Sequence, residues 1–223
     1  MISHQYKAIF IHIPKCAGSS ITAVLAGKPP HERLPGRDHR CLREIEPRLF
    51  PSSFIVQKRT NQILKAIRRG RLLKKDQSIR GNVTKSQYQE YFKFTVVRNP
   101  WARAVSLYRN VIRSEMHLRN FRLDPHVGFA EFLRLHAGKS MLAPQKYWII
   151  DHQGNVPFDF IARHENIARD WEIIAGKIGL DSAMLQHRLS QGAVDYREYY
   201  NDELNHIIET VFRDDIERFD YEF

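Results

Sequence analysis

Two apolar runs dominate the hydrophobic pattern, and each is followed by a polar turn and a second, periodically apolar segment. Residues 8–13 (AIFIHI) are largely apolar and rich in β-branched side chains, as in a buried parallel strand, and Pro14 ends the run. A helix is predicted from Ser19, because small hydroxyl residues favour helix starts and apolar residues resume at 21–25. This first unit is therefore strand, turn, helix.

The second run gives the same order of elements. Residues 92–97 (FKFTVV) predict a strand, and Arg98-Asn99-Pro100 follows it. Apolar positions then recur at helical spacing from Trp101 to Val111. Since proline is favoured at the start of a helix, the boundary between turn and helix is well marked.

Weaker patterns extend the alternation of strands and helices. A strand is predicted at 158–162, and a short helix capped by Asp38 at 41–45. Further helices are predicted at residues 126–137, 166–178 and 202–213. This alternation is typical of an α/β domain with a mainly parallel central sheet. The length of 223 residues suits one domain, residues 1–223.

The charge of the chain predicts a polyanionic partner. Lys and Arg number 35 against 25 Asp and Glu, which gives a formal net charge of +10. Basic residues gather at about 57–86, where Asp76 is the single acid and apolar spacing predicts a basic amphipathic helix. We interpret this segment as an insertion or lid, with a solvated basic face as the simplest explanation of its charge.

Cysteine usage and the lack of an apolar leader define the expected compartment. Cys16 and Cys41 are too few for a secreted disulfide framework and lack zinc-site spacing. The sequence contains neither a signal-peptide pattern nor an uncharged run of about 18 residues. We therefore expect a cytoplasmic protein without a transmembrane segment, and the start at Met1 favours a bacterial enzyme over a trimmed catalytic domain.

The first turn has the properties of an anion-binding site. The amides and dipole of the following helix favour an anion. Lys15 adds a full charge, Gly18 allows close backbone approach, and Ser19 and Ser20 add hydroxyl donors. The turn is not a Walker A motif, because G-x-x-x-x-G-K-[ST] is absent from the chain. An ordinary strand-to-helix connection with a surface lysine is the alternative.

The second turn carries another cation and hydroxyl. Arg98 lies at the end of its strand and Ser106 about two turns into the next helix. Arginine suits bidentate phosphate recognition, and ligands of α/β sheets lie at the carboxyl ends of strands. A helix-capping arginine with a packed serine is the alternative. Taken together, the two turns favour a ligand with phosphates at two separate places.

Both turns resemble nucleotide-binding motifs of sulfotransferases that use PAPS (3′-phosphoadenosine 5′-phosphosulfate), most closely those of the carbohydrate-type branch. The residues similar to the 5′-phosphosulfate loop are Pro14, Lys15, Cys16, Ala17, Gly18, Ser19 and Ser20. The 3′-phosphate motif is matched by residues 94–108, with Arg98 and Ser106. Shorter pieces agree at Pro144-Gln145 with Trp148, at 163–166 and at 199–223. The resemblance thus covers nearly the whole chain, apart from 57–86.

The resemblance implies a P-loop-like, three-layer α/β/α fold and a reaction. A sulfuryl group passes from PAPS to a hydroxyl, on a glycan or small glycoside, and 3′,5′-ADP is released without a metal. Two residues depart from the family: Cys16 stands where Thr is usual, and Ala17 where a second Gly is common. Cys16 either fills the turn as a small side chain or, if Lys15 activates its thiol, makes the loop sensitive to oxidation.

The implied chemistry needs charge stabilisation and a base. Lys15, with the amides of 18–20, is expected to stabilise negative charge on the departing oxygen. His39 is the predicted base, since in the resembling enzymes a His or an acid follows the first helix. His12, alternatively a core histidine, is the second candidate, and Glu44 the third.

Other interpretations stay open at this point. Arg103 and Arg163 either orient the nucleotide or acceptor, or form structural salt bridges. The whole chain is alternatively a P-loop-like nucleotide kinase, which the missing Walker A order opposes, or a non-catalytic basic module that binds polyanions, which 57–86 alone supports. Nucleic acid is not expected as a partner.

Overall fold

The computed structural model describes residues 1–28, 38–47, 81–186 and 194–223. Most of the basic segment at 57–86, with the amphipathic helix predicted in it, lies outside these residues. Among the described residues, no helix combines the length and the apolar character needed to cross a membrane.

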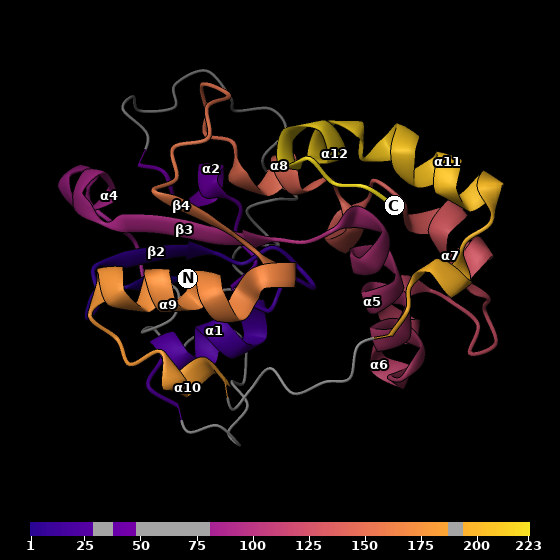
Figure 1. The fold of residues 1–223 in the computed structure, drawn as a ribbon, viewed down its shortest axis with the longest axis horizontal. Helices are drawn as coiled ribbons and strands as arrows, with labels where there is room; N and C mark the ends of the chain where they lie inside the picture. The colour runs from indigo at the N-terminus through magenta and orange to yellow at the C-terminus, as the bar shows by residue number, and fades with distance from the viewer. Residues whose placement is uncertain (29–37, 48–80, 187–193) are drawn as a thin grey trace, which may run out of the picture.

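A four-stranded, mostly parallel sheet forms the centre of the fold (Figure 1). The strands lie in the order β1 (Ile2–Ser3), β2 (Ala8–Ile11), β3 (Phe92–Val97) and β4 (Phe160–Arg163). β1 is antiparallel to β2, whereas β2, β3 and β4 run parallel. The predicted α/β class with a mainly parallel sheet is therefore confirmed. The carboxyl ends of β2, β3 and β4 meet at one edge.

Helices cover both faces of the sheet and give three layers (Figure 1). One layer consists of α1 (Gly18–Leu25), α9 (Ile167–Ile178) and α10 (Ala183–Gln186). The opposite layer consists of α2 (Leu42–Ile45), α8 (Gln145–Ile149) and α12 (Arg213–Phe219). Because both faces are covered, the side chains of β2 are all buried, and the rings of Phe10 and Phe94 stack 5.0 Å apart between the strands.

A further group of helices lies beyond the carboxyl end of β3 (Figure 1). Its members are α5 (Pro100–Ile112), α6 (Glu115–Phe121), α7 (Phe129–His136) and α11 (Asp202–Val211). The remaining elements in the described residues are α4 (Lys85–Glu90) and the 3₁₀ turns η1 (Ser140–Leu142), η2 (His164–Asn166) and η3 (Arg197–Tyr199). The helices predicted from Trp101 and at 126–137, 166–178 and 202–213 correspond to α5, α7, α9 and α11.

Two predicted helix caps are wrong. α1 begins at Gly18 with Ala17 as its N-cap, so no hydroxyl side chain caps it. The short helix α2 begins after Cys41, whose backbone N–H donates to the Glu44 carboxylate at 2.9 Å. Asp38, the predicted cap, instead forms ion pairs with the Met1 ammonium group and Arg40.

Candidate active site

The turn between β2 and α1 is tight and partly left-handed. Lys15 has φ 71° and Ala17 has φ 56°, a conformation that costs a residue with a Cβ about 1–2 kcal/mol. The Ser20 N–H donates to the Ala17 carbonyl at 3.0 Å, so it does not belong to the predicted anion hole. The amides of Gly18 and Ser19 begin the first turn of α1, where helical amides lack carbonyl partners within the helix. Two of the three predicted amide donors thus suit an anion.

Gly18 is required by the ring of His12. A Cβ added at Gly18 would lie 1.9 Å from Cδ2 of the imidazole, far inside van der Waals contact. The sequence predicts that Gly18 lets a ligand approach the backbone closely. In the structure, the space beside Gly18 is occupied by the His12 ring. Any residue other than glycine at position 18 therefore displaces the His12 ring.

The two candidate bases, His12 and His39, are in contact. Nδ1 of His39 lies 3.2 Å from the carbonyl oxygen of His12, and the rings are 4.3 Å apart. A carbonyl only accepts, so Nδ1 of His39 is the donor, and a neutral His39 carries its lone pair on Nε2. His12 is buried and His39 half-buried. Glu44, the third candidate, is used to cap α2.

Asp38 anchors the segment that carries His39. Its buried carboxylate lies 3.2 Å from the Met1 ammonium nitrogen and 2.9 Å from Nη2 of Arg40. Burial by itself would raise the pKa of Asp38, but these two cations outweigh burial and hold the pKa well below its usual value. The ion pair thus connects residue 38 to the start of β1.

Replacing Asp38 with asparagine is expected to lower the free energy of unfolding by about 3–5 kcal/mol, because the buried Met1 ammonium and the half-buried Arg40 guanidinium lose the negative charge beside them. Since folding depresses the pKa of Asp38, its contribution is full above pH about 4 and is lost as pH falls below that value. Urea titrations of both proteins between pH 3 and 7 measure this: the difference between them should narrow on acidification. A difference independent of pH would contradict the assignment.

The cations of the two turns converge. Nη1 of Arg98 donates to the carbonyl oxygen of Lys15 at 3.2 Å. Val97 and Arg163 pair in register on β3 and β4, so Arg98 and His164 are the next residues at the same edge. Burial and the charges of Arg98 and Lys15 lower the pKa of His164 to about 4, which leaves the imidazole neutral at pH 7.

Arg98 has a side-chain N–H group that is not used in a hydrogen bond to the described residues. Its Nε is buried without a hydrogen-bond partner among the residues that the structure describes. Burial lowers the pKa of Arg98, yet an arginine stays charged in proteins. A half-buried cation with a buried, unused donor at the end of a parallel strand suits an anionic ligand. Ser106 lies half-buried two turns into α5, the helix that follows Arg98.

Cys16 is a packing residue of the first turn. Both cysteines are buried free thiols. Burial raises the pKa of Cys16 to about 12, against a smaller lowering by Arg103 and Arg98, so the thiolate needed for oxidation is disfavoured at neutral pH. The structure therefore favours the small-side-chain interpretation over an oxidation-sensitive loop.

The two remaining arginine candidates donate to backbone carbonyl oxygens. Arg103 is fully buried and donates to the carbonyl oxygens of Pro14 at 3.1 Å and of Met141 and Ala143 at 2.9 Å. Arg163 donates to the carbonyl of Phe219 and lies over the Tyr221 ring. Their predicted structural salt bridges are thus replaced by carbonyl contacts, and Arg103 fixes the start of the first turn.

Asn99 holds the second turn in place. Its Oδ1 accepts from the Ala102 N–H at 3.2 Å and caps α5, so the proposed helix-capping role of Arg98 is wrong. The Asn99 N–H donates to the Glu165 carboxylate at 2.7 Å, and its Nδ2 to the Glu222 carbonyl at 2.8 Å. Sequence reasoning missed these contacts, because they join residues far apart in the chain.

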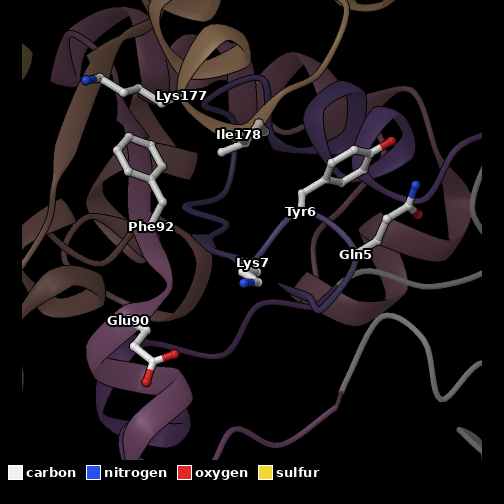
Figure 2. A pocket seen from close by; sticks show the side chains of 7 residues that line it. All are labelled: Gln5, Tyr6, Lys7, Glu90, Phe92, Lys177 and Ile178. Carbon is white, nitrogen blue, oxygen red and sulfur yellow. The ribbon is translucent and has the colours of Figure 1, made fainter.

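A separate pocket lies at the opposite edge of the sheet (Figure 2). Its lining residues are Gln5, Tyr6, Lys7, Glu90, Phe92, Lys177 and Ile178. Lys7 precedes β2 and Phe92 begins β3, so the pocket adjoins the amino ends of the strands. It is therefore distinct from the convergence of Lys15, Arg98 and His164.

The geometry agrees with a comparison to known families. A family model described as "Sulfotransferase family" matches residues 1–222, essentially the whole chain. The chain belongs to the sulfotransferase family. The match is to the carbohydrate sulfotransferase type, as the two nucleotide motifs predict, and it supports sulfuryl transfer over the kinase and polyanion-module alternatives.

One relative and the solved structures add little further detail. An uncharacterized protein of Archaeoglobus fulgidus is 31% identical to this sulfotransferase over 121 residues, which is 54% of this chain and 94% of that protein. No solved structure matches the chain. The assignment of the fold to a P-loop-like type thus follows from the family and from the arrangement of strands and helices.

Proposed function

We propose that this sulfotransferase transfers a sulfuryl group from PAPS to a carbohydrate hydroxyl and releases 3′,5′-ADP. The observation that carries the proposal is the pairing of Arg98 with the first turn: its Nη1 donates to the Lys15 carbonyl at 3.2 Å while its buried Nε lacks an acceptor among the described residues. Two cations at neighbouring strand ends suit the two separate phosphate groups of such a nucleotide.

In this proposal, each of the two turns binds a different phosphate group of the nucleotide. Lys15 and the amides of Gly18 and Ser19 would hold the 5′-phosphosulfate, with Pro14, Cys16, Ala17 and Ser20 shaping the turn. Arg98 and Ser106 would hold the 3′-phosphate. When bound, PAPS supplies the sulfuryl group, and Lys15 would stabilise the negative charge left on the departing oxygen. The described residues contain no group of three or more metal-ligand side chains, and the proposed roles use none.

His39 is the proposed general base. Its Nδ1 contact with the His12 carbonyl sets the tautomer, so Nε2 is the basic nitrogen of the neutral ring. His12 is less suited to meet an acceptor hydroxyl, because its buried ring fills the space beside Gly18. His12 therefore acts in this proposal as the group that orients His39.

The acceptor is proposed to be a glycan or small glycoside. The carbohydrate type of the family supports this class, and a net charge of +10 would attract an acidic glycan. A screen of glycan acceptors with labelled PAPS tests the class, and labelling of a phenol or steroid but of no glycan would contradict it.

The test of nucleotide binding is a thermal shift without metal. At about 100 times its Kd, 3′,5′-ADP should stabilise the protein by about 2.7 kcal/mol, which raises Tm by about 5–10 °C for a chain of this length. ATP should give a much smaller shift. A shift with Mg-ATP alone would favour a kinase, and steeply salt-dependent binding of any polyanion would favour a binding module.

Replacing Arg98 with alanine is expected to weaken 3′,5′-ADP about 10–100-fold, because the 3′-phosphate loses charged hydrogen bonds. Calorimetric titration measures the change. Arg119→Ala is the matched control, since its side chain is 81% exposed and lies on α6, outside both turns. Equal affinity in Arg98→Ala and Arg119→Ala would remove Arg98 from the binding site.

A further inference from the structure

We propose that Gln145 is a positioning residue that fixes the spacing of the two phosphate-binding turns, so that one nucleotide's 3′- and 5′-phosphates bind cooperatively. This inference rests on the proposed function and adds a residue that the nucleotide motifs do not contain. Gln145 lies at the start of α8, outside both turns, and is fully buried.

The carboxamide of Gln145 pairs with both backbone groups of Arg98. Its Oε1 accepts from the Arg98 N–H at 2.8 Å, and its Nε2 donates to the Arg98 carbonyl at 2.8 Å. Val97 is the last residue of β3, so the carboxamide continues the hydrogen bonding of the backbone beyond the strand. The second turn is thereby fixed at the residue that carries its cation.

The same carboxamide reaches the first turn. Oε1 of Gln145 also accepts from the Sγ–H of Cys16 at 3.5 Å. One side chain therefore contacts the middle of the first turn and the start of the second, 129 and 47 residues away in the chain. The Arg98–Lys15 contact joins the same two turns by a separate route.

The other side of Gln145 is held by the helix α12. The carboxylate of Asp215 accepts from the Gln145 N–H at 2.6 Å and from the Lys146 N–H at 2.9 Å. Asp215 is fully buried, so water does not compete for these bonds. The position of the carboxamide is thus determined by the backbone of α8 and a buried acceptor, independently of a ligand.

A fixed spacing has a specific consequence for binding. If the turns are held at the correct separation, a nucleotide that engages one turn meets the other without further ordering of the protein. The affinity gained from a second phosphate is then large. When the spacing is free to vary, that gain falls, while the binding of a single phosphate changes little.

The experiment compares three nucleotides by calorimetric titration: 3′,5′-ADP, 5′-AMP and 3′-AMP. The gain is the ratio of the 3′,5′-ADP affinity to that of either monophosphate. Gln145→Met keeps the length of the side chain but removes its donor and acceptor. We expect the gain to fall about tenfold, while the monophosphate affinities change less than about threefold.

Thr95→Val is the matched control. The hydroxyl of Thr95 donates to the Ile11 carbonyl at 2.8 Å, so this variant removes a buried hydrogen bond between β2 and β3 without touching either turn. It should lower Tm and leave the gain unchanged. If Gln145→Met does not fold, Cys16→Ala cuts the contact with the first turn alone, and a gain reduced about threefold is expected.

The outcomes separate this inference from the proposed function. An unchanged gain in Gln145→Met or, failing that, in Cys16→Ala overturns the positioning role while the nucleotide assignment stands. An equal loss of affinity for all three nucleotides also overturns it, because a general defect would not depend on the second phosphate. If the unmodified protein does not bind 3′,5′-ADP, the proposed function itself fails.

Discussion

Replacing Lys15 with alanine is expected to lower kcat about 10²–10³-fold and to weaken 3′,5′-ADP less than about tenfold. Lys15 would interact most strongly with charge that develops on the departing oxygen, so its loss raises the barrier more than it weakens the ground state. Alanine keeps the β-carbon, so the cost of the left-handed backbone at position 15 is the same in the variant. Single-turnover measurements with labelled PAPS separate the chemical step from nucleotide release.

Lys177→Ala provides the control for Lys15→Ala. Lys177 lines the pocket at the opposite edge of the sheet (Figure 2), so the control removes the same charge away from both turns. Its kcat should stay within about twofold of the unmodified enzyme, since a surface charge remote from the site contributes little to the barrier. A kcat for Lys15→Ala within threefold of the control would exclude Lys15 from catalysis.

His39→Ala is expected to lower kcat about 10²–10⁴-fold through the loss of the general base. The affinity for 3′,5′-ADP should change less than about twofold, because the proposed role of His39 is to take the proton of the acceptor hydroxyl and not to bind the nucleotide. The pH–rate profile supplies a second measurement: the acidic limb, which reports protonation of the base, should disappear in the variant.

His126→Ala is the control for the loss of a histidine, since His126 is exposed. It should retain both kcat and the acidic limb. If His39→Ala retains turnover with its acidic limb intact, the base is another group. His12, whose carbonyl accepts from His39, is then the first residue to test.

The strongest local patterns were sufficient to predict the framework of the site. β3 and α5 are set by an apolar run, a proline at the helix start and helical spacing, all of which are properties of neighbouring residues. Because β2 and β3 are parallel, their two turns had to meet at one edge of the sheet. The convergence of Lys15 and Arg98 was therefore predictable.

The contacts that support the site were not predictable in this way. Gln145 was noticed only as part of a resemblance, because its partners Cys16, Arg98 and Asp215 are 47 to 129 residues away. Hydrogen bonds between distant residues leave no periodic signal in the sequence. The cap assigned to Asp38 failed for a related reason, since a distant ammonium group competes for its carboxylate.

The packing of His12 against Gly18 restricts how this loop can change during evolution. A side chain at position 18 is incompatible with the imidazole, since its Cβ would lie 1.9 Å from Cδ2 of His12. A relative with a larger residue at position 18 should therefore carry a smaller residue at position 12 or place the ring elsewhere. Positions 12 and 18 should accordingly covary. His12, the residue that follows β2, is then the reason that position 18 must be glycine.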